Sequence, residues 1–194
     1  TIENLTRAFA GRYSEREIEA IAAKVFENLA VMFFEFMRLP WLTEKTLGRY
    51  VEFTGLEHFD GALKKGRGVL LITGHFGNWE LLGVALALRG YKLDIVAREL
   101  DSPLFERFVH WVRTRHGNRL ISKSRSMRRL MKSLAENSIA ALLVDQNVAL
   151  AEGVFVDFFS IPACTNKGPA LLAETSSASA VPAFIVRERR RHRV

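Results

Sequence analysis

A short apolar strand followed at once by a long apolar helix is the feature that most constrains the fold of this chain. Residues 68–74 form a β-rich apolar run bounded by glycines, which is typical of a strand buried on both faces of a sheet. From Trp79 a second apolar run continues to an arginine and a glycine at residues 89–90, a common way for a helix to end. The sequence therefore predicts a strand–turn–helix unit whose turn lies at residues 74–78.

Further strand-like runs alternate with helix-like runs along the chain. We expect strands at residues 93–96, 119–121, 139–144 and 181–186. Ser102 and Pro103 are typical of a helix N-terminus, and Gly117 would end that helix. Apolar residues at helical spacing predict another helix over residues 126–137. This alternation predicts an α/β fold with a largely parallel central sheet flanked by helices.

The chain has the size and composition of one globular domain. Its 194 residues are 48% hydrophobic, and no linker or internal repeat divides them. We expect a helical segment at residues 1–46 and an α/β core at residues 47–194. Cys164 is the only cysteine, which excludes an intramolecular disulfide. It could be a nucleophile served by His75, although a small buried apolar residue is the more common role.

The helix predicted at residues 24–38 carries its polar residues in one narrow stripe. At about 100° per residue these side chains fall within roughly a third of the helix circumference, with aromatic residues and methionines around the remainder. The stripe consists of Lys24, Glu27, Asn28, Glu35 and Arg38. The apolar run is far shorter than the ~20 residues that span a bilayer. Packing against the domain, docking at a membrane interface and lining of an acyl groove remain open alternatives.

His75 and Glu80 bracket the predicted turn and the first turn of the helix. The partial positive charge of a helix N-terminus favours neutral imidazole and stabilises a carboxylate. A neutral histidine can take a proton from a hydroxyl group, and a carboxylate on its other nitrogen would orient it. Gly74 and Gly77 would let a substrate approach closely. The pair therefore predicts a general base, with a helix cap and an ordinary first-turn acid as the structural alternative.

Arg98 and Asp145 follow two of the predicted strands. Open α/β sheets bind ligands at the carboxyl ends of their strands, and His75 lies at the same predicted edge. A structural salt bridge between Arg98 and Asp145 is one interpretation. The other is a functional role for both residues at this edge.

The net charge of +7 permits nucleic acid, anionic lipid or an acidic protein as a partner. Basic residues gather around the start of the helix predicted at 126–137, where they could bind phosphate groups or form a solvated face. They are Lys123, Arg125, Arg128, Arg129 and Lys132. A nucleic-acid-binding module is the alternative from another class, but the aromatic residues lie in apolar runs and the chain has no recognisable nucleic-acid-binding motif.

Several familiar active-site motifs are absent from the sequence. It contains no G-x-S-x-G, no G-x-x-x-x-G-K-[ST], no G-x-G-x-x-G and no H-E-x-x-H. The sequence thus gives no support for the serine hydrolase, nucleotide-binding or zinc sites that these motifs build.

His75 and Glu80 resemble the H-x4-[DE] motif of the glycerolipid and lysophospholipid acyltransferase superfamily. Later runs, in matching order, resemble the lipid A biosynthesis late acyltransferases of the lauroyl/myristoyl type. These runs are residues 96–98 with 102–103, then 143–147, 155–159 and 163–165, and the resemblance extends over about residues 47–186. No proline precedes Asp145, where some members have one. The resemblance makes Arg98 a candidate for binding an anion and Asp145 a candidate for orienting it. Members usually begin with an apolar membrane anchor and continue further, so we expect an internal part of a longer protein.

The resemblance implies acyl transfer from an acyl-carrier-protein thioester to a hydroxyl of a lipid A precursor at the cytoplasmic face of the bacterial inner membrane. His75 would be the general base and Glu80 would orient it, while Arg98 and turn amides near Gly77 and Asn78 would stabilise the oxyanion. The acyl donor is a co-substrate, so no cofactor and no metal are expected. The partners would be acyl carrier protein, an anionic glycolipid and the membrane surface, without nucleic acid. An acyl-CoA-dependent glycerolipid or glycosyl-lipid acyltransferase is the alternative, although the F-P-E-G-T block of glycerolipid members is absent.

Overall fold

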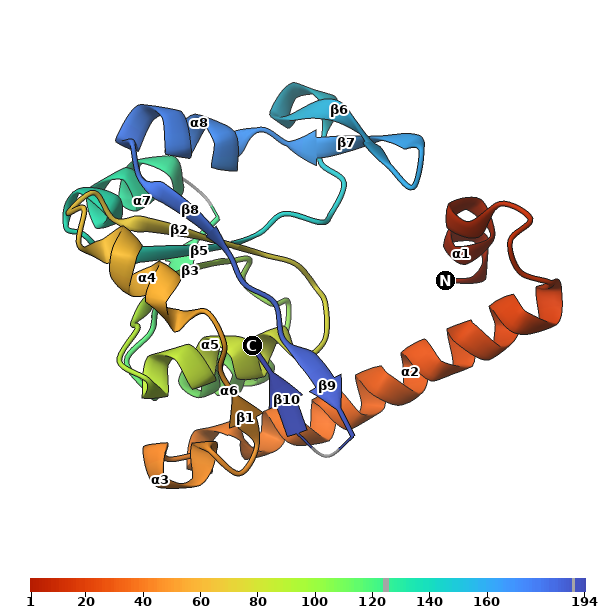
Figure 1. The fold of residues 1–194 in the computed structure, drawn as a ribbon, viewed down its shortest axis with the longest axis horizontal. Coiled ribbons are helices and arrows are strands. Elements are labelled where there is room, and N and C mark those ends of the chain that lie inside the picture. The colour runs from red at the N-terminus through yellow and green to blue at the C-terminus, as the bar shows by residue number, and fades with distance from the viewer. Residues whose placement is uncertain (124–125, 190) are drawn as a thin grey trace.

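A five-stranded parallel sheet forms the centre of the computed structural model, which describes residues 1–123, 126–189 and 191–194 (Figure 1). The strand order is β4 (Arg119–Ser122), β3 (Leu93–Ala97), β5 (Ile139–Leu143), β2 (Val69–Thr73) and β8 (Ser179–Pro182). Each neighbouring pair of strands is parallel. The predicted α/β fold with a parallel central sheet is therefore confirmed.

Strand β2 lies between β5 and β8 and is buried on both faces. Val69, Leu70 and Leu71 are at most 1% exposed. Because side chains alternate along a strand, Val69 and Leu71 belong to one hydrophobic cluster and Leu70 to the other. The glycine-bounded apolar run thus forms the doubly covered strand that its composition predicts.

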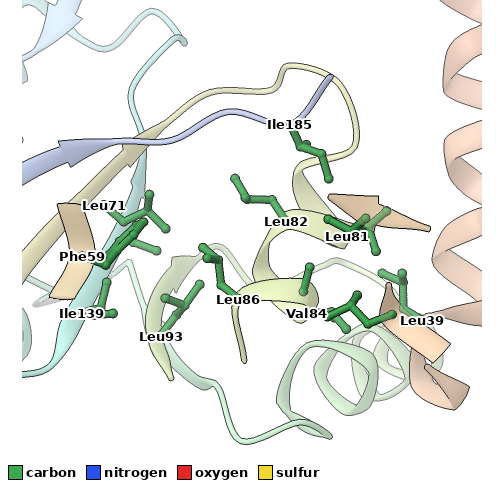
Figure 2. Packing of buried hydrophobic residues seen from close by; sticks show 14 of the residues in the cluster. Leu39, Phe59, Leu71, Leu81, Leu82, Val84, Leu86, Leu93, Ile139 and Ile185 are labelled. Carbon is green, nitrogen blue, oxygen red and sulfur yellow. The ribbon is translucent and has the colours of Figure 1, made fainter. Parts of the chain in front are cut away.

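Helices cover both faces of the sheet (Figure 1). The face that carries Leu71 packs against α4 (Leu56–Leu63), α5 (Trp79–Leu88) and α6 (Pro103–Thr114), and Figure 2 shows Leu71 beside Phe59, with the α5 leucines filling the same core. The other face packs against α7 (Ser126–Ala135) and α8 (Gly168–Ser176). The sheet is the middle layer of a three-layer structure.

Most predicted boundaries lie within a few residues of the observed ones. Helix α6 begins at Pro103, with Ser102 at its N-cap, and Gly117 follows its end with a φ of 96°. Helix α7 ends at Ala135, two residues earlier than expected. The expected strand at 181–186 is divided between β8 and β9 (Val186–Glu188), because the chain leaves the parallel sheet to bury Ile185 in the core.

Two smaller sheets flank this centre. One has the order β1 (Val51–Glu52), β10 (Arg191–Arg193) and β9, and lies beside the long N-terminal helix (Figure 1). The other is the antiparallel pair β6 (Gly153–Phe158) and β7 (Ile161–Asn166), which follows the 3-10 turn η2 (Leu150–Glu152).

The N-terminal third of the chain is helical, as predicted. It contains α1 (Ile2–Phe9), α2 (Glu15–Arg38), the 3-10 turn η1 (Leu39–Trp41) and α3 (Glu44–Leu47). A capping box of Ser14 and Glu17 begins α2, which extends well beyond the sheet (Figure 1). In the described parts of the chain, no helix combines the length and apolarity needed to cross a bilayer.

Helix α2 turns part of its polar stripe toward the protein. Glu35 and Asn28 contact Arg187 of β9, with Glu35 as the main partner at N···O distances of 2.5 and 2.7 Å. Aromatic side chains of α2 are left exposed instead, Phe26 at 60% and Phe34 at 69%. The ion pair explains this orientation, since the carboxylate has its cationic partner on the protein side.

Candidate active site

The turn between β2 and α5 carries His75, whose nearest partner is Asp145 after β5. The His75 backbone N–H donates to Asp145 Oδ2 at 2.8 Å, and His75 Nδ1 lies 2.9 Å from Asp145 Oδ1. Because Thr73 and Leu143 are paired in register, the parallel strands β2 and β5 deliver both residues to the same edge of the sheet. The expectation that His75 and Asp145 share the carboxyl edge agrees with this geometry.

The electrostatics of the pair suit a base. Burial raises the pKa of Asp145, but hydrogen bonds from the His75 side chain and backbone outweigh burial and hold the pKa below its ordinary value. An ionised Asp145 accepts the Nδ1–H of a neutral imidazole, which leaves Nε2 free to accept a proton. Both side chains are 36% exposed, so a substrate can reach them.

Close packing around the pair fixes its position. The Trp79 ring meets the His75 ring edge-on, with centroids 5.0 Å apart. A Cβ on Gly74 would lie 3.1 Å from Asp145 Cγ, so glycine permits the close approach of the carboxylate.

Glu80 does not contact His75 in this arrangement, contrary to the orienting role expected from the sequence. Its carboxylate accepts two hydrogen bonds from Arg113 of α6, from Nε at 3.0 Å and Nη2 at 2.6 Å. The Glu80 and Arg113 side chains are only 13% and 24% exposed. Burial lowers the pKa of Arg113, but the hydrogen bonds and charge of Glu80 outweigh burial and raise it. The pair therefore joins α5 to α6, and the carboxylate on the imidazole comes from Asp145.

Arg98 lies just after β3 at the same edge but does not meet Asp145. Its guanidinium is 3.9 Å from Asp101, and its side chain is 81% exposed. The salt bridge considered between Arg98 and Asp145 is not formed, and both oxygens of that carboxylate bond His75 instead. The Arg98 guanidinium is therefore open to solvent at this edge.

Gly77 and Asn78 shape the turn from within. Gly77 has a φ of 59°, and a Cβ there would fall 1.8 Å from the Ile185 carbonyl oxygen, so only glycine fits. Asn78 is 1% exposed and caps α5, its Oδ1 accepting from the Leu81 N–H at 2.9 Å. The side chain of Asn78 is therefore committed to the protein.

Among the other residues considered from the sequence, Lys123 directly follows β4 and its backbone N–H donates to the Ala97 carbonyl oxygen at 3.1 Å. Cys164 lies in β7, with its sulfur 4.0 Å from the Ala149 carbonyl oxygen. Lys123, Arg128, Arg129 and Lys132 are exposed at or near α7, and Arg125 lies outside the described residues.

Two functional-site neighbours escaped prediction, Arg113 and the Glu35 carboxylate that binds Asn78 Nδ2 at 2.7 Å. The sequence does contain a signal for a partner such as Arg113, because Glu80 lies among the apolar residues of α5 and a buried carboxylate needs a cation.

The fold and this edge define an α/β protein with a histidine and an aspartate in a general-base arrangement. The family model described as "Bacterial lipid A biosynthesis acyltransferase" matches residues 2–194, so the chain belongs to this family.

Individual relatives include two kinds of acyltransferase. A phosphatidylinositol mannoside acyltransferase of Mycobacterium tuberculosis is 32% identical, over 76% of this chain and 48% of the relative. The lipid A biosynthesis lauroyltransferase of Escherichia coli is 25% identical, over 91% and 57%. The myristoyltransferase of the same organism is 27% identical, over 98% and 59%. The chain therefore spans about half the length of the curated relatives it matches.

Proposed function

We propose that the protein transfers a fatty acyl group from an acyl-carrier-protein thioester to a hydroxyl of a lipid A precursor. Membership of the lipid A acyltransferase family supports the reaction and the class of acceptor. The observation that carries the chemistry is the hydrogen-bonded pair of His75 and Asp145 at the open edge of the sheet.

In this reaction His75 is the general base. Its Nε2 takes the proton of the acceptor hydroxyl while Asp145 holds Nδ1–H and stabilises the imidazolium that forms. The acceptor oxygen attacks the thioester carbonyl carbon, and the carbonyl electrons move onto its oxygen. When the tetrahedral intermediate collapses, the thiolate leaves and takes the proton from His75. No covalent acyl-enzyme and no cofactor are needed.

Stabilisation of the oxyanion is assigned to the turn and to Arg98. Backbone amides near Gly77 and Asn78 lie at the start of α5, where the helix dipole favours negative charge. Arg98, exposed at the same edge, can bind the oxyanion or a phosphate of the glycolipid. Glu80 contributes indirectly, because its ion pair with Arg113 holds α5 against α6.

The reaction is proposed to take place at the cytoplasmic surface of the inner membrane. Apolar side chains are exposed along α2 and on the β6–β7 pair, and they suit insertion among lipids. They include Phe26, Phe33, Phe34, Phe155, Phe158 and Phe159. The basic residues at α7 suit an anionic lipid or acyl carrier protein, both of which are negatively charged.

A different glycosylated lipid is the second candidate acceptor. The 32% identity to a phosphatidylinositol mannoside acyltransferase favours it, because that relative acts on a glycosylated phosphoinositide. The base chemistry would be the same, with acyl-CoA as the corresponding alternative donor. The two candidates therefore differ in the acceptor and in the acyl donor, and not in the chemistry of His75.

Acyl transfer by the full-length protein in detergent tests this proposal. The donor is acyl carrier protein or CoA that carries a labelled acyl group. Each donor is supplied with a lipid A precursor, a phosphoinositide mannoside or a lysophospholipid as the acceptor. Transfer to the lipid A precursor, reduced about 10²–10⁴-fold by His75→Ala without loss of folding, is the expected result. Near-normal transfer by His75→Ala would contradict the mechanism, and transfer only to another acceptor would contradict the substrate.

A further inference from the structure

Glu35 of α2 contacts three other elements next to the turn at residues 74–78, which carries His75. Its Oε2 accepts from Asn78 Nδ2 and from Arg187 Nη2, both at 2.7 Å. Its Oε1 accepts from Arg187 Nη1 at 2.5 Å and lies 3.2 Å from His192 Nε2. Asn78 and His192 are at most 3% exposed. One carboxylate thus links α2 to the start of α5 and to strands β9 and β10.

This carboxylate is held in its charged form and in one orientation. Burial raises the pKa of Glu35, but hydrogen bonds from His192, Arg187 and Asn78 together outweigh burial and hold the pKa far below its ordinary value. The guanidinium of Arg187 bonds both oxygens of the Glu35 carboxylate, and this geometry fixes the plane of the carboxylate relative to the plane of the guanidinium.

Two routes lead from Glu35 to the turn that carries His75. The first is direct, because the Asn78 side chain that caps α5 also donates to Glu35. The second runs through Arg187, because Ile185, two residues earlier, places its carbonyl oxygen against Gly77. Asn78 is therefore held by α2, through Glu35, and Gly77 packs against the segment before β9, through Ile185.

We propose that Glu35 is a positioning residue for His75 that acts through Asn78 and Arg187. The proposal rests on the proposed acyl transfer. His75 bonds Asp145 through both its backbone N–H and its ring, so a small displacement of the turn would lengthen both contacts at once. A misplacement of about 1 Å at a reacting group can cost about 10²-fold in rate.

Glu35→Gln in the full-length protein tests this role, because it removes the charge and keeps the size of the side chain. The matched control is Glu27→Gln, an exposed glutamate two turns earlier in α2. We expect kcat to fall about 10- to 100-fold in Glu35→Gln, with KM for donor and acceptor within about twofold, and no change in the control. A wild-type kcat in folded Glu35→Gln would overturn the proposal.

A double-mutant comparison separates positioning from a general structural role. If Glu35 acts through His75, Glu35→Gln will not lower the residual rate of His75→Ala any further. The same fold-loss in both backgrounds would overturn the proposal. Should Glu35→Gln fail to fold, Asn78→Ser replaces it, since serine still caps α5 but lacks the amide N–H that Asn78 donates to Glu35. It is expected to lower kcat in the same range, and an unchanged kcat would overturn the proposal.

Amide hydrogen exchange provides a test that does not depend on activity. Exchange at residues 75–81 should be faster in Glu35→Gln than in the wild type, and unchanged in Glu27→Gln. Equal exchange in all three proteins would overturn the positioning role. A wild-type protein inactive with every donor and acceptor would contradict the proposed function, while the exchange result would still decide whether Glu35 holds the turn.

Discussion

The edge of the parallel sheet and the interface between α5 and α6 each place one carboxylate near the turn that carries His75, but with different partners. Asp145 lies 70 residues from His75 in sequence and bonds both its backbone and its ring. Glu80 lies only five residues away and pairs with Arg113 instead. In a parallel sheet, neighbouring strands deliver distant residues to one edge, so the partner of a catalytic histidine is decided by strand order and not by spacing along the chain.

The largest expected difference between the two regions is in turnover. Asp145→Asn should lower kcat about 10²–10⁴-fold, because an amide can neither stabilise imidazolium nor select the tautomer with Nε2 free. Glu80→Gln should lower kcat less than about tenfold in protein that remains folded. Steady-state kinetics of both variants checks this, and a greater loss in Glu80→Gln would reverse the roles of the two carboxylates.

Stability should show the opposite order. Arg113→Met leaves the largely buried Glu80 carboxylate without its cation, and we expect the free energy of unfolding to fall by about 3 kcal/mol. Arg98→Met, at an exposed arginine, should change it by less than about 0.5 kcal/mol. Urea unfolding of both variants measures the difference. Equal stabilities would mean that the α5–α6 ion pair does not hold the interface.

Glu35 should add a pH dependence to stability. Its pKa is lower in the folded protein than its ordinary value of 4.5, so the unfolded chain binds its proton at a higher pH than the folded one. The contribution of the charged Glu35 to the free energy of unfolding is therefore complete well above pH 4.5, and it is lost as the pH falls below this value. The gap in unfolding free energy between wild type and Glu35→Gln should narrow from pH 7 to pH 3. A gap independent of pH would contradict the charged cluster.

The apolar face of α2 should give the smallest effect. Phe34 is 69% exposed, so Phe34→Ser should leave stability unchanged but weaken binding to anionic lipid vesicles about fivefold, from loss of about 1 kcal/mol of apolar burial. Leu171→Ser, at an exposed apolar residue of α8, is the matched control. Vesicle co-sedimentation measures both, and equal binding by Phe34→Ser and wild type would remove α2 from the proposed membrane surface.

Much of the fold could be predicted from the sequence, because the signals for β2, α5 and α6 are local. Glycines, apolar runs and Pro103 mark where these elements begin and end. The split of the last predicted strand was missed because burial of Ile185 is a tertiary event with no local signal.

The site could be predicted only in part. His75 and the shared edge with Asp145 follow from strand ends, which apolar runs reveal. The partners of the carboxylates do not follow from such runs. Arg113 and Arg187 reach Glu80 and Glu35 from distant elements, and helix faces alone do not specify which cation meets which acid.

Histidine ¹⁵N NMR on the full-length protein tests most directly whether Asp145 orients His75. The His75 signal, identified by its loss in His75→Ala, should report the tautomer protonated at Nδ1 at a pH where imidazole is neutral. That tautomer should persist in Glu80→Gln and give way to a mixture in Asp145→Asn. An unchanged His75 signal in Asp145→Asn, with a mixture in Glu80→Gln instead, would contradict the pairing on which the proposed mechanism depends.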